Sequence, residues 1–332
     1  MLNLNRKFDI LKCLYSIQAQ TYKNYEVIII DNASTDGSVM EIKKKFPEVV
    51  VFKTIKNLGT SYTRNAGVKF ANGELIWFLD NDTYLPEIHT INNLVQLFID
   101  DPSIDGIGGE AEINKNNEII GTKKLKLFPN GLTKGYFYQN EKYKKISVKV
   151  IATCNLLIKK EAFEKVGGFD HFYFFYLEDI DLTYRISQAG FNIYVYHKCP
   201  VVHNFSESSR FNNHFKSKRN RIYFILKNLG IKNIIFLPLY DFFYIVNLDN
   251  LKRIYKKFFH NQKNYNNLIK SDKKKISLIN IFDTLKITSI TVLSILTSYI
   301  YIPIYFFKYS FKLRRQINFL NKINNNDFTI VK

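Results

Sequence analysis

The sequence has few cysteines. Its 332 residues include three, Cys13, Cys154 and Cys199, and no two of them have the spacing of metal ligands. Their isolation and odd number argue against a disulfide framework. We expect reduced thiols in the core of a cytosolic domain. The N-terminus also lacks the long apolar run of a secretory signal peptide.

Acidic residues are scarce in the last third of the chain. Residues 216–332 carry 22 Lys and Arg against 5 Asp and Glu, whereas residues 1–215 carry 26 against 24. The net charge of +19 therefore belongs almost entirely to the C-terminal part, and residues 1–215 have the balance of an ordinary globular domain. Because long apolar segments interrupt the basic stretches, we expect no nucleic-acid partner.

Buried strands and amphipathic helices alternate over the first hundred residues, which predicts an α/β sheet. We expect strands at 26–30, 49–52 and 75–79, and helices at 8–20, 39–46 and 60–71. Further along we expect a helix at 86–100, a closely packed strand at 106–109, a polar hairpin or excursion at 113–149, a strand at 150–158, and helices at 160–166 and 178–190. Ligands of such sheets bind at the carboxyl ends of the strands.

Two acidic segments stand at that edge. The loop 31–38 follows one strand, and Asp80-Asn81-Asp82 follows the apolar run 75–79. By itself the pair Asp80 and Asp82 fits a polar turn that caps the next helix. The alternative is a divalent cation that holds a phosphorylated ligand, since carboxylates suit Mg²⁺ or Mn²⁺.

Three segments in order resemble the family 2 glycosyltransferases, and within them the rhamnosyltransferase-like group. They are QTYKNYEVIIIDNASTDGS (20–38), Asp80-Asn81-Asp82, and Gly167-Gly168-Phe169-Asp170 followed by Glu178-Asp179-Ile180-Asp181-Leu182 and Arg185. The resemblance implies a GT-A fold (Rossmann-like, mostly parallel sheet with flanking helices) and an inverting enzyme. We expect a catalytic domain at 1–228 and a membrane-associated helical region at 229–332.

The same resemblance assigns roles to individual residues. Asp82 would hold the metal, and Asp80 would hold the ribose or a metal-bound water. Arg64 would lie near the diphosphate or be a surface residue, and His203 would be a third ligand or a solvated loop residue. The residues expected on the nucleotide-sugar side are Asn3, Asn5, Asp31, Asn32, Arg64, Asp80 and Asn81. Thr35-Asp36-Gly37 is expected to form a turn and helix cap.

The acidic pair Glu178-Asp179 matches the pair whose second member acts as general base in the family. Asp179 would take the proton from the acceptor hydroxyl, while Glu178 is either catalytic or structural. Asp181 and Arg185, at i,i+4 spacing on one helix face, are expected to be structural. Cys154-Asn155 departs from the small Gly-Ala pair that faces the acceptor in the family.

The first strand departs further from the family. Residues 1–6 resemble only the tail of the usual central strand, so about five strand residues are absent by comparison. Either the start of translation lies upstream or the chain is a truncated form with weaker nucleotide binding.

The C-terminal part contains an uncharged stretch of 21 residues, 287–307, beside the Lys-rich segment 252–275. Its length is sufficient for a bilayer span. A buried hairpin and an interfacial helix pair on anionic lipid remain alternatives.

Together these features predict a metal-dependent (Mn²⁺ or Mg²⁺) glycosyltransferase at the cytoplasmic face of the cell membrane. It would transfer a hexose or deoxyhexose from a UDP- or dTDP-sugar to a lipid-linked or polysaccharide acceptor. One rival is a catalytically impaired binding protein with the same fold. A second is a nucleotidyltransferase, although no Gly-rich, Lys- or Arg-bearing loop follows the first strand.

Overall fold

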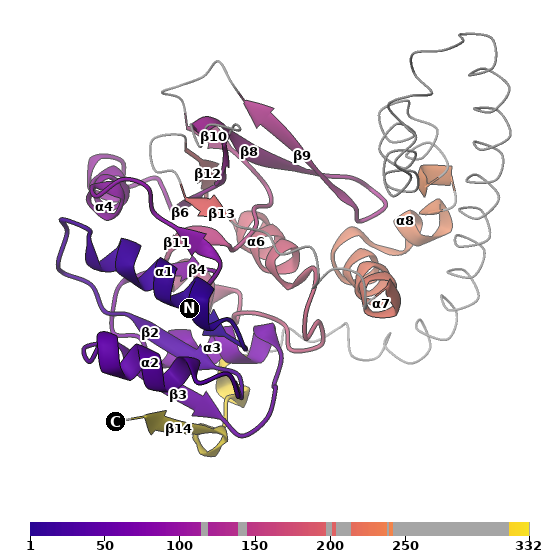
Figure 1. The fold of residues 1–332 in the computed structure, drawn as a ribbon. Coiled ribbons are helices and arrows are strands. Elements are labelled where there is room, and N and C mark those ends of the chain that lie inside the picture. The colour runs from indigo at the N-terminus through magenta and orange to yellow at the C-terminus, as the bar shows by residue number, and fades with distance from the viewer. Residues whose placement is uncertain are drawn as a thin grey trace, which may run out of the picture. The chain divides into compact units, whose positions relative to one another are not determined.

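The computed structural model describes residues 1–113, 119–138, 145–196, 201–203, 214–237, 239–241 and 319–331. The chain divides into two compact units, one of 1–128, 132–221 and 316–332, the other of 129–131 and 222–315. Figure 1 shows the first unit as strands with helices packed around them.

The helices are α1 (Lys7–Gln18), α2 (Ser38–Lys45), α3 (Thr60–Phe70), α4 (Thr90–Asp100), α5 (Lys160–Lys165), α6 (Glu178–Gln188), α7 (His214–Phe224) and α8 (Ile231–Ile235). A π-helical turn, Ile225–Leu229, joins α7 to α8. The strands are β1 (Leu2–Asn3), β2 (Ile28–Asp31), β3 (Val50–Thr54), β4 (Leu75–Leu79), β5 (Thr83–Tyr84), β6 (Gly106–Gly108), β7 (Glu110–Ile113), β8 (Ile119–Leu127), β9 (Thr133–Tyr138), β10 (Ile146–Ser147), β11 (Asn155–Lys159), β12 (Ile193–Val195), β13 (Val202–His203) and β14 (Phe328–Val331).

These strands form three sheets, in the orders β1-β2-β3-β14, β10-β12-β6-β11-β4 and β5-β13-β7-β8-β9. The expectation of a mostly parallel sheet is correct only for the first sheet, in which β1, β2 and β3 run parallel. The other two sheets contain both parallel and antiparallel pairs. The reason is that β11 follows the β8–β9 hairpin instead of a helical crossover. It therefore enters antiparallel to both β4 and β6.

Two apolar clusters hold the first unit together. One packs α1 and α2 on β2 and β3 through Ile10, Leu14, Ile29, Ile42 and Val51. The other packs α3, α5 and α6 on β4 and β11 through side chains that include Val68, Phe78, Leu156, Phe163 and Leu182. The first cluster contains Ile29 and Leu79 and the second contains Phe78, so residues close before the loops at 31–38 and 80–82 are anchored in the core.

Two predicted elements are shorter than expected. The helix predicted at 86–100 begins at Thr90, because Gln20 Nε2 holds the Glu87 carbonyl at 2.7 Å in a preceding turn. The strand predicted at 150–158 begins at Asn155, because the Ile151 N–H bonds to Thr183 Oγ1 of α6 at 3.2 Å instead of to a strand. The closely packed strand at 106–109 is confirmed: a Cβ on Gly108 would lie 2.0 Å from the Asn155 carbonyl oxygen.

The C-terminal residues return to the first sheet. β14 pairs antiparallel with β3, with Phe328 opposite Thr54, and appears beside it in Figure 1. No pattern in the sequence indicated this strand. The segment 287–307 and most of the predicted membrane-associated region lie outside the described residues. Within the described ranges, none of the helices has the length and apolar character that a bilayer span requires.

Candidate active site

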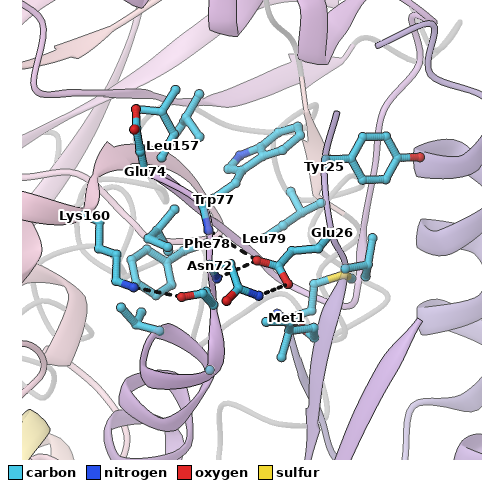
Figure 2. A pocket seen from close by; sticks show the side chains of 18 of the residues that line it. Met1, Tyr25, Glu26, Asn72, Glu74, Trp77, Phe78, Leu79, Leu157 and Lys160 are labelled. Atoms are coloured by element: carbon cyan, nitrogen blue, oxygen red, sulfur yellow. Dashed lines mark hydrogen bonds between the residues drawn. The ribbon is translucent and has the colours of Figure 1, made fainter. Parts of the chain in front are cut away.

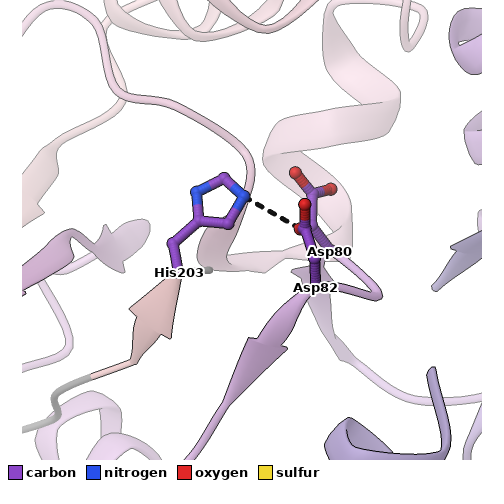
Figure 3. A group of neighbouring side chains, drawn as sticks. All are labelled: Asp80, Asp82 and His203. Atoms are coloured by element: carbon purple, nitrogen blue, oxygen red, sulfur yellow. Dashed lines mark hydrogen bonds and ion pairs between the residues drawn. The ribbon is translucent and has the colours of Figure 1, made fainter. Parts of the chain in front are cut away.

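Asp80, Asp82 and His203 converge at the end of β4 (Figure 3). Asp80 directly follows the strand, and the short β5 pairs antiparallel with β13 so that His203 lies opposite Thr83. This pairing places His203 Nε2 2.9 Å from Asp82 Oδ1. One ligand atom from each of the three side chains lies within 4.8 Å of the others. The structure thus brings together the three residues predicted as metal ligands.

The donor set fits a divalent cation of the Mg²⁺ or Mn²⁺ type, because two carboxylates and an imidazole suit these ions. Burial raises the pKa of Asp82, but the hydrogen bond from His203 and the charges of His203 and Arg6 outweigh it and hold that pKa below its ordinary value. Asp82 is therefore an anion in the pH range where a metal site functions.

Arg64 of α3 lies at the centre of the site. Its Nη2 donates to Asp80 Oδ1 at 2.6 Å and its Nη1 to Glu178 Oε1 at 3.2 Å. The side chain is only 11% exposed, so the alternative of a surface arginine is wrong. One guanidinium therefore links the acids after β4 to the acids that open α6.

Glu178 and Asp179 occupy the first turn of α6. Burial raises the pKa of Glu178 to about 7, the charge of Asp179 adds to the rise, and Arg64 opposes it. Burial also raises the pKa of Asp179, again against the effect of Arg64. Thr60 Oγ1 donates to Glu178 Oε1 at 3.0 Å, whereas Oε2 has no hydrogen-bond partner in the described part of the chain. Asp181 bonds to Arg185 at 2.8 Å and is fully buried, which confirms that this pair is structural.

The loop before α6 is held in an uncommon backbone conformation. Phe174, Tyr176 and Leu177 all have positive φ, between 58° and 72°. Such residues are disfavoured by roughly 1 kcal/mol each unless their surroundings fix them. The buried Asn220 does so, because its Nδ2 lies 3.0, 2.8 and 2.8 Å from the carbonyl oxygens of Tyr173, Phe175 and Tyr176. Asn220 therefore helps to orient the start of α6.

A cavity of about 280 Å³ joins these groups. Its wall includes Asp80 and His203, two of the three predicted metal ligands, together with the predicted base Asp179. Arg64, Cys154 and Glu178 line it as well. Cys154 reaches the cavity, whereas the Asn155 amide is bonded at both ends, to Trp77 and to the Gly109 carbonyl. Cys154 is thus the side chain of that pair which can shape the space for a substrate.

Three of the seven predicted nucleotide-side residues, Asn3, Asp31 and Asn32, are buried, and a fourth, Asn81, bonds to Asn3. The Asn3 Nδ2 lies 2.9 Å from Asp31 Oδ2 and 2.8 Å from Ser38 Oγ, and the Asn3 Oδ1 accepts from Asn81 Nδ2 at 3.0 Å. Asp31 and Asn32 are 0% and 2% exposed. These side chains hold the loops around the site in place. Asn5 is exposed and has a positive φ of 52°, yet it also holds the loop after Asp31, because its Oδ1 accepts from the Thr35 N–H at 2.8 Å.

The turn after Asp31 forms as expected. Asp36 Oδ1 accepts from the Ser38 N–H at 3.0 Å, and Gly37 has a φ of 77° at the start of α2. Thr35, Asp36 and Gly37 therefore form the predicted turn and cap.

Arg6 is a functional candidate that no sequence motif indicated. Its guanidinium donates to Asp82 Oδ2 at 2.8 Å and pairs with Asp9 at 3.0 Å. The one available signal was a basic pair, Arg6-Lys7, directly after the first strand. Arg6 brings a positive charge to the acid that faces His203.

Comparison with known proteins identifies related sequences and folds. The profile of glycosyl transferase family 2 matches residues 1–167, and that of the N-terminal domain of galactosyltransferase matches residues 136–213. An uncharacterized glycosyltransferase of Haemophilus influenzae is 32% identical over 172 residues, which cover 49% of this chain and 53% of that protein. The N-acetylglucosaminyl-diphospho-decaprenol L-rhamnosyltransferase of Mycobacterium tuberculosis is 27% identical over 227 residues, covering 59% of this chain and 72% of that protein.

A solved structure shares the fold. The mannosyltransferase of Pyrobaculum calidifontis, in complex with GDP-Man and Mn²⁺, has a TM-score of 0.54 at 15% identity. The likeness covers 91% of this chain and 85% of that one. At this identity it shows a common GT-A-like α/β fold. The H. influenzae match spans about half of that relative's length.

Proposed function

The chain belongs to glycosyl transferase family 2, and from this premise we propose that it is an inverting, metal-assisted glycosyltransferase. It transfers a hexosyl or deoxyhexosyl group from a UDP- or dTDP-sugar to a lipid-linked or polysaccharide acceptor. One observation carries the proposal: a single small cavity has Asp80 and His203, next to Asp82, on its wall together with Glu178 and Asp179. The mycobacterial relative, whose name specifies a diphospho-lipid acceptor, supports the acceptor class.

Asp80, Asp82 and His203 would hold Mn²⁺ or Mg²⁺. When bound, the ion supplies positive charge that stabilises the departing diphosphate. Arg64 lies against Asp80 and lines the same cavity, so its guanidinium is placed to add to that stabilisation.

Asp179 acts as the general base. Its carboxylate takes the proton of the acceptor hydroxyl while that oxygen forms the new bond to the anomeric carbon. The bond from the anomeric carbon to the diphosphate breaks in the same displacement, and its electron pair leaves with the diphosphate. A single displacement inverts the anomeric configuration. Glu178, fixed by Thr60 and Arg64, positions the helix turn that carries Asp179.

The enzyme works at the cytoplasmic face of the cell membrane in this proposal. Support comes from the composition of the C-terminal part, where the uncharged segment 287–307 follows eight Lys and one Arg within 252–275. Lysines beside an apolar segment favour anionic lipid headgroups. Sedimentation with lipid vesicles tests this location. We expect more protein to sediment with phosphatidylcholine vesicles that contain about 30% phosphatidylglycerol, which resemble an anionic leaflet, than with phosphatidylcholine vesicles alone.

A binding protein that has lost catalysis is the second candidate. One observation favours it, because β1 comprises only Leu2 and Asn3 and contributes little backbone to the nucleotide side. This candidate would bind the donor weakly and show no turnover, whereas the enzyme would show turnover.

The deciding experiment is a donor screen with Mn²⁺ and Mg²⁺ on the detergent-solubilised full chain. We expect transfer from one UDP- or dTDP-sugar, and a loss on the order of 10²–10⁴-fold in Asp179→Asn. Asp82→Ala should abolish transfer as well. Asp100→Asn changes an exposed acid and serves as the matched control. Full activity of Asp179→Asn would refute the assignment of the base, and donor binding without any turnover would favour the second candidate.

A further inference from the structure

The second unit contains a helical segment that is apolar on two faces. The segment comprises residues 231–237 and 239–241 and begins with α8. Beyond α8 the backbone bonds remain helical, because the Phe236 N–H donates to the Lys232 carbonyl at 3.1 Å and the Tyr240 N–H to the Phe236 carbonyl at 3.0 Å. Successive side chains are therefore turned by about 100° around one axis.

One face of this segment is buried inside the unit. Ile234 and Leu237 belong to an apolar cluster with Ile225 of the π-helical turn, and all three are at most 5% exposed. Asp241 lies on the same face, where its Oδ1 accepts from Asn130 Nδ2 at 2.8 Å. These contacts hold the segment in place, and the acid among them is buried away from the surface.

The other face presents large apolar side chains to the surface. Ile231, Ile235, Phe236 and Leu239 are between 47% and 65% exposed. Together with Lys232 they fall within an arc of roughly 140° around the helix axis, and we call these five residues the α8 stripe. Single exposed apolar residues are ordinary on a protein surface, but four on one helix face mark a contact site.

The charge of the unit indicates which partner fits the α8 stripe. Residues 222–315 carry 16 Lys and Arg against 4 Asp and Glu. A second copy of the chain on the stripe would bring two strongly positive units together, which like-charge repulsion opposes. Lys232 lies within the stripe and Lys227 stands on the π-helical turn before it. An apolar face beside lysines matches a surface that is negative outside and apolar beneath.

We propose that the α8 stripe lies in the headgroup region of an anionic lipid membrane, with the helix axis in the membrane plane. This inference rests on the membrane location in the proposed function and names the residues that make the contact. The four apolar side chains enter the boundary between headgroups and acyl chains, and the Lys232 ammonium extends to the lipid phosphates. Such a helix needs one apolar face, whereas a bilayer span needs about 20 apolar residues.

A tryptophan placed in the α8 stripe tests the proposal. The sequence contains one tryptophan, Trp77, which lines a cavity of about 1050 Å³ in the first unit (Figure 2). Its indole N–H donates to Asn155 Oδ1 at 2.8 Å, and its fluorescence provides the background in the wild type. Phe236→Trp adds an indole to the stripe. Ile55→Trp adds one at an exposed apolar position of the first unit and is the matched control.

Each full-length protein is mixed with vesicles of brominated phosphatidylcholine, with and without about 30% phosphatidylglycerol. We expect the added indole of Phe236→Trp to be quenched, most strongly by bromine at a depth of roughly 5–10 Å, and to emit at a shorter wavelength. Phosphatidylglycerol should increase this quenching. The fluorescence of the wild type and of Ile55→Trp should change little with either lipid.

Equal quenching of Phe236→Trp and Ile55→Trp, or quenching that phosphatidylglycerol does not increase, would overturn the proposal. Short-wavelength emission of Phe236→Trp without lipid would overturn it too, because another part of the chain or a second copy would then cover the stripe. Sedimentation with the same vesicles separates this test from that of the proposed location. A chain that sediments with an unquenched added indole refutes only the stripe, whereas a chain that stays in solution refutes both.

Discussion

His203 Nε2 lies 2.9 Å from Asp82 Oδ1, although 121 residues separate the two in the chain. The antiparallel pairing of β13 with β5 brings them together. Three features of the site meet at this contact: an acid at the end of a core strand, an imidazole from a distant strand, and the charge of Arg6 on the other oxygen of the same carboxylate.

Replacement of His203 by alanine should weaken Mn²⁺ binding, since it removes one of three clustered ligand side chains. We expect at least about 10-fold weaker affinity by isothermal titration calorimetry. His89→Ala, which removes an exposed histidine, is the control and should bind like the wild type. Unchanged Mn²⁺ affinity in His203→Ala would exclude His203 as a ligand.

Glu178 should make stability depend on pH. Its pKa is about 7 in the folded protein against an ordinary value of 4.5, so the folded state keeps the proton more tightly. The stabilising contribution is fully present below pH 4.5 and is lost as the pH rises through about 7. Glu178→Gln should remove a change in the free energy of unfolding on the order of 1–3 kcal/mol across this pH window.

Chemical denaturation of both proteins at several pH values between these limits measures that slope. Glu164→Gln, on an exposed part of the chain, should keep the wild-type slope. If wild type and Glu178→Gln respond to pH identically, the burial of Glu178 has no energetic consequence.

Asn220→Ala should loosen the loop that precedes α6, because three carbonyl oxygens lose the same donor. We expect the free energy of unfolding to fall by about 2–3 kcal/mol, with faster deuterium exchange at residues 173–181. Asn233→Ala is the matched control, since its Nδ2 donates to one carbonyl, that of Leu229, at 2.6 Å. Slow exchange at 173–181 in Asn220→Ala would mean that the positive-φ residues are held by other contacts.

Phe328→Ala should detach β14 from the first sheet. The ring stacks on Tyr62 at a centroid distance of 6.0 Å and meets Phe70 edge-on at 5.6 Å. Because the side chain is only half-buried, the loss should be about 1–2 kcal/mol in denaturant unfolding. The exposed neighbour Thr329→Ala should change stability by less than about 0.5 kcal/mol. A loss no larger than that of Thr329→Ala would show that β14 is held by its backbone alone.

Local features of the sequence predicted most of the framework. The strands at 26–30, 49–52 and 75–79 and the helices between them are confirmed within a few residues. Each of them is encoded in a contiguous stretch by apolar periodicity, and the strands at 26–30 and 75–79 are each followed directly by an aspartate, Asp31 and Asp80. The acids at 80–82 and 178–179 were found for the same reason, since they directly follow or open such elements.

Contacts between distant segments were not readable in this way. The sequence left Arg64 as either a surface residue or a site residue, and only its two carboxylate partners, one of them 114 positions away, decided this. Arg6 on Asp82 and β14 on β3 likewise depend on pairings between segments that carry no local signal.

The sequence by itself therefore determined the elements, the acids at their ends and the family resemblance. The tertiary structure decided which of these side chains meet, as His203 meets Asp82 and Arg64 meets Asp80 and Glu178. The physical reason is that helix and strand propensity act over a few neighbouring residues. The register between strands is instead set by the packing of whole faces, which involves residues from every part of the chain.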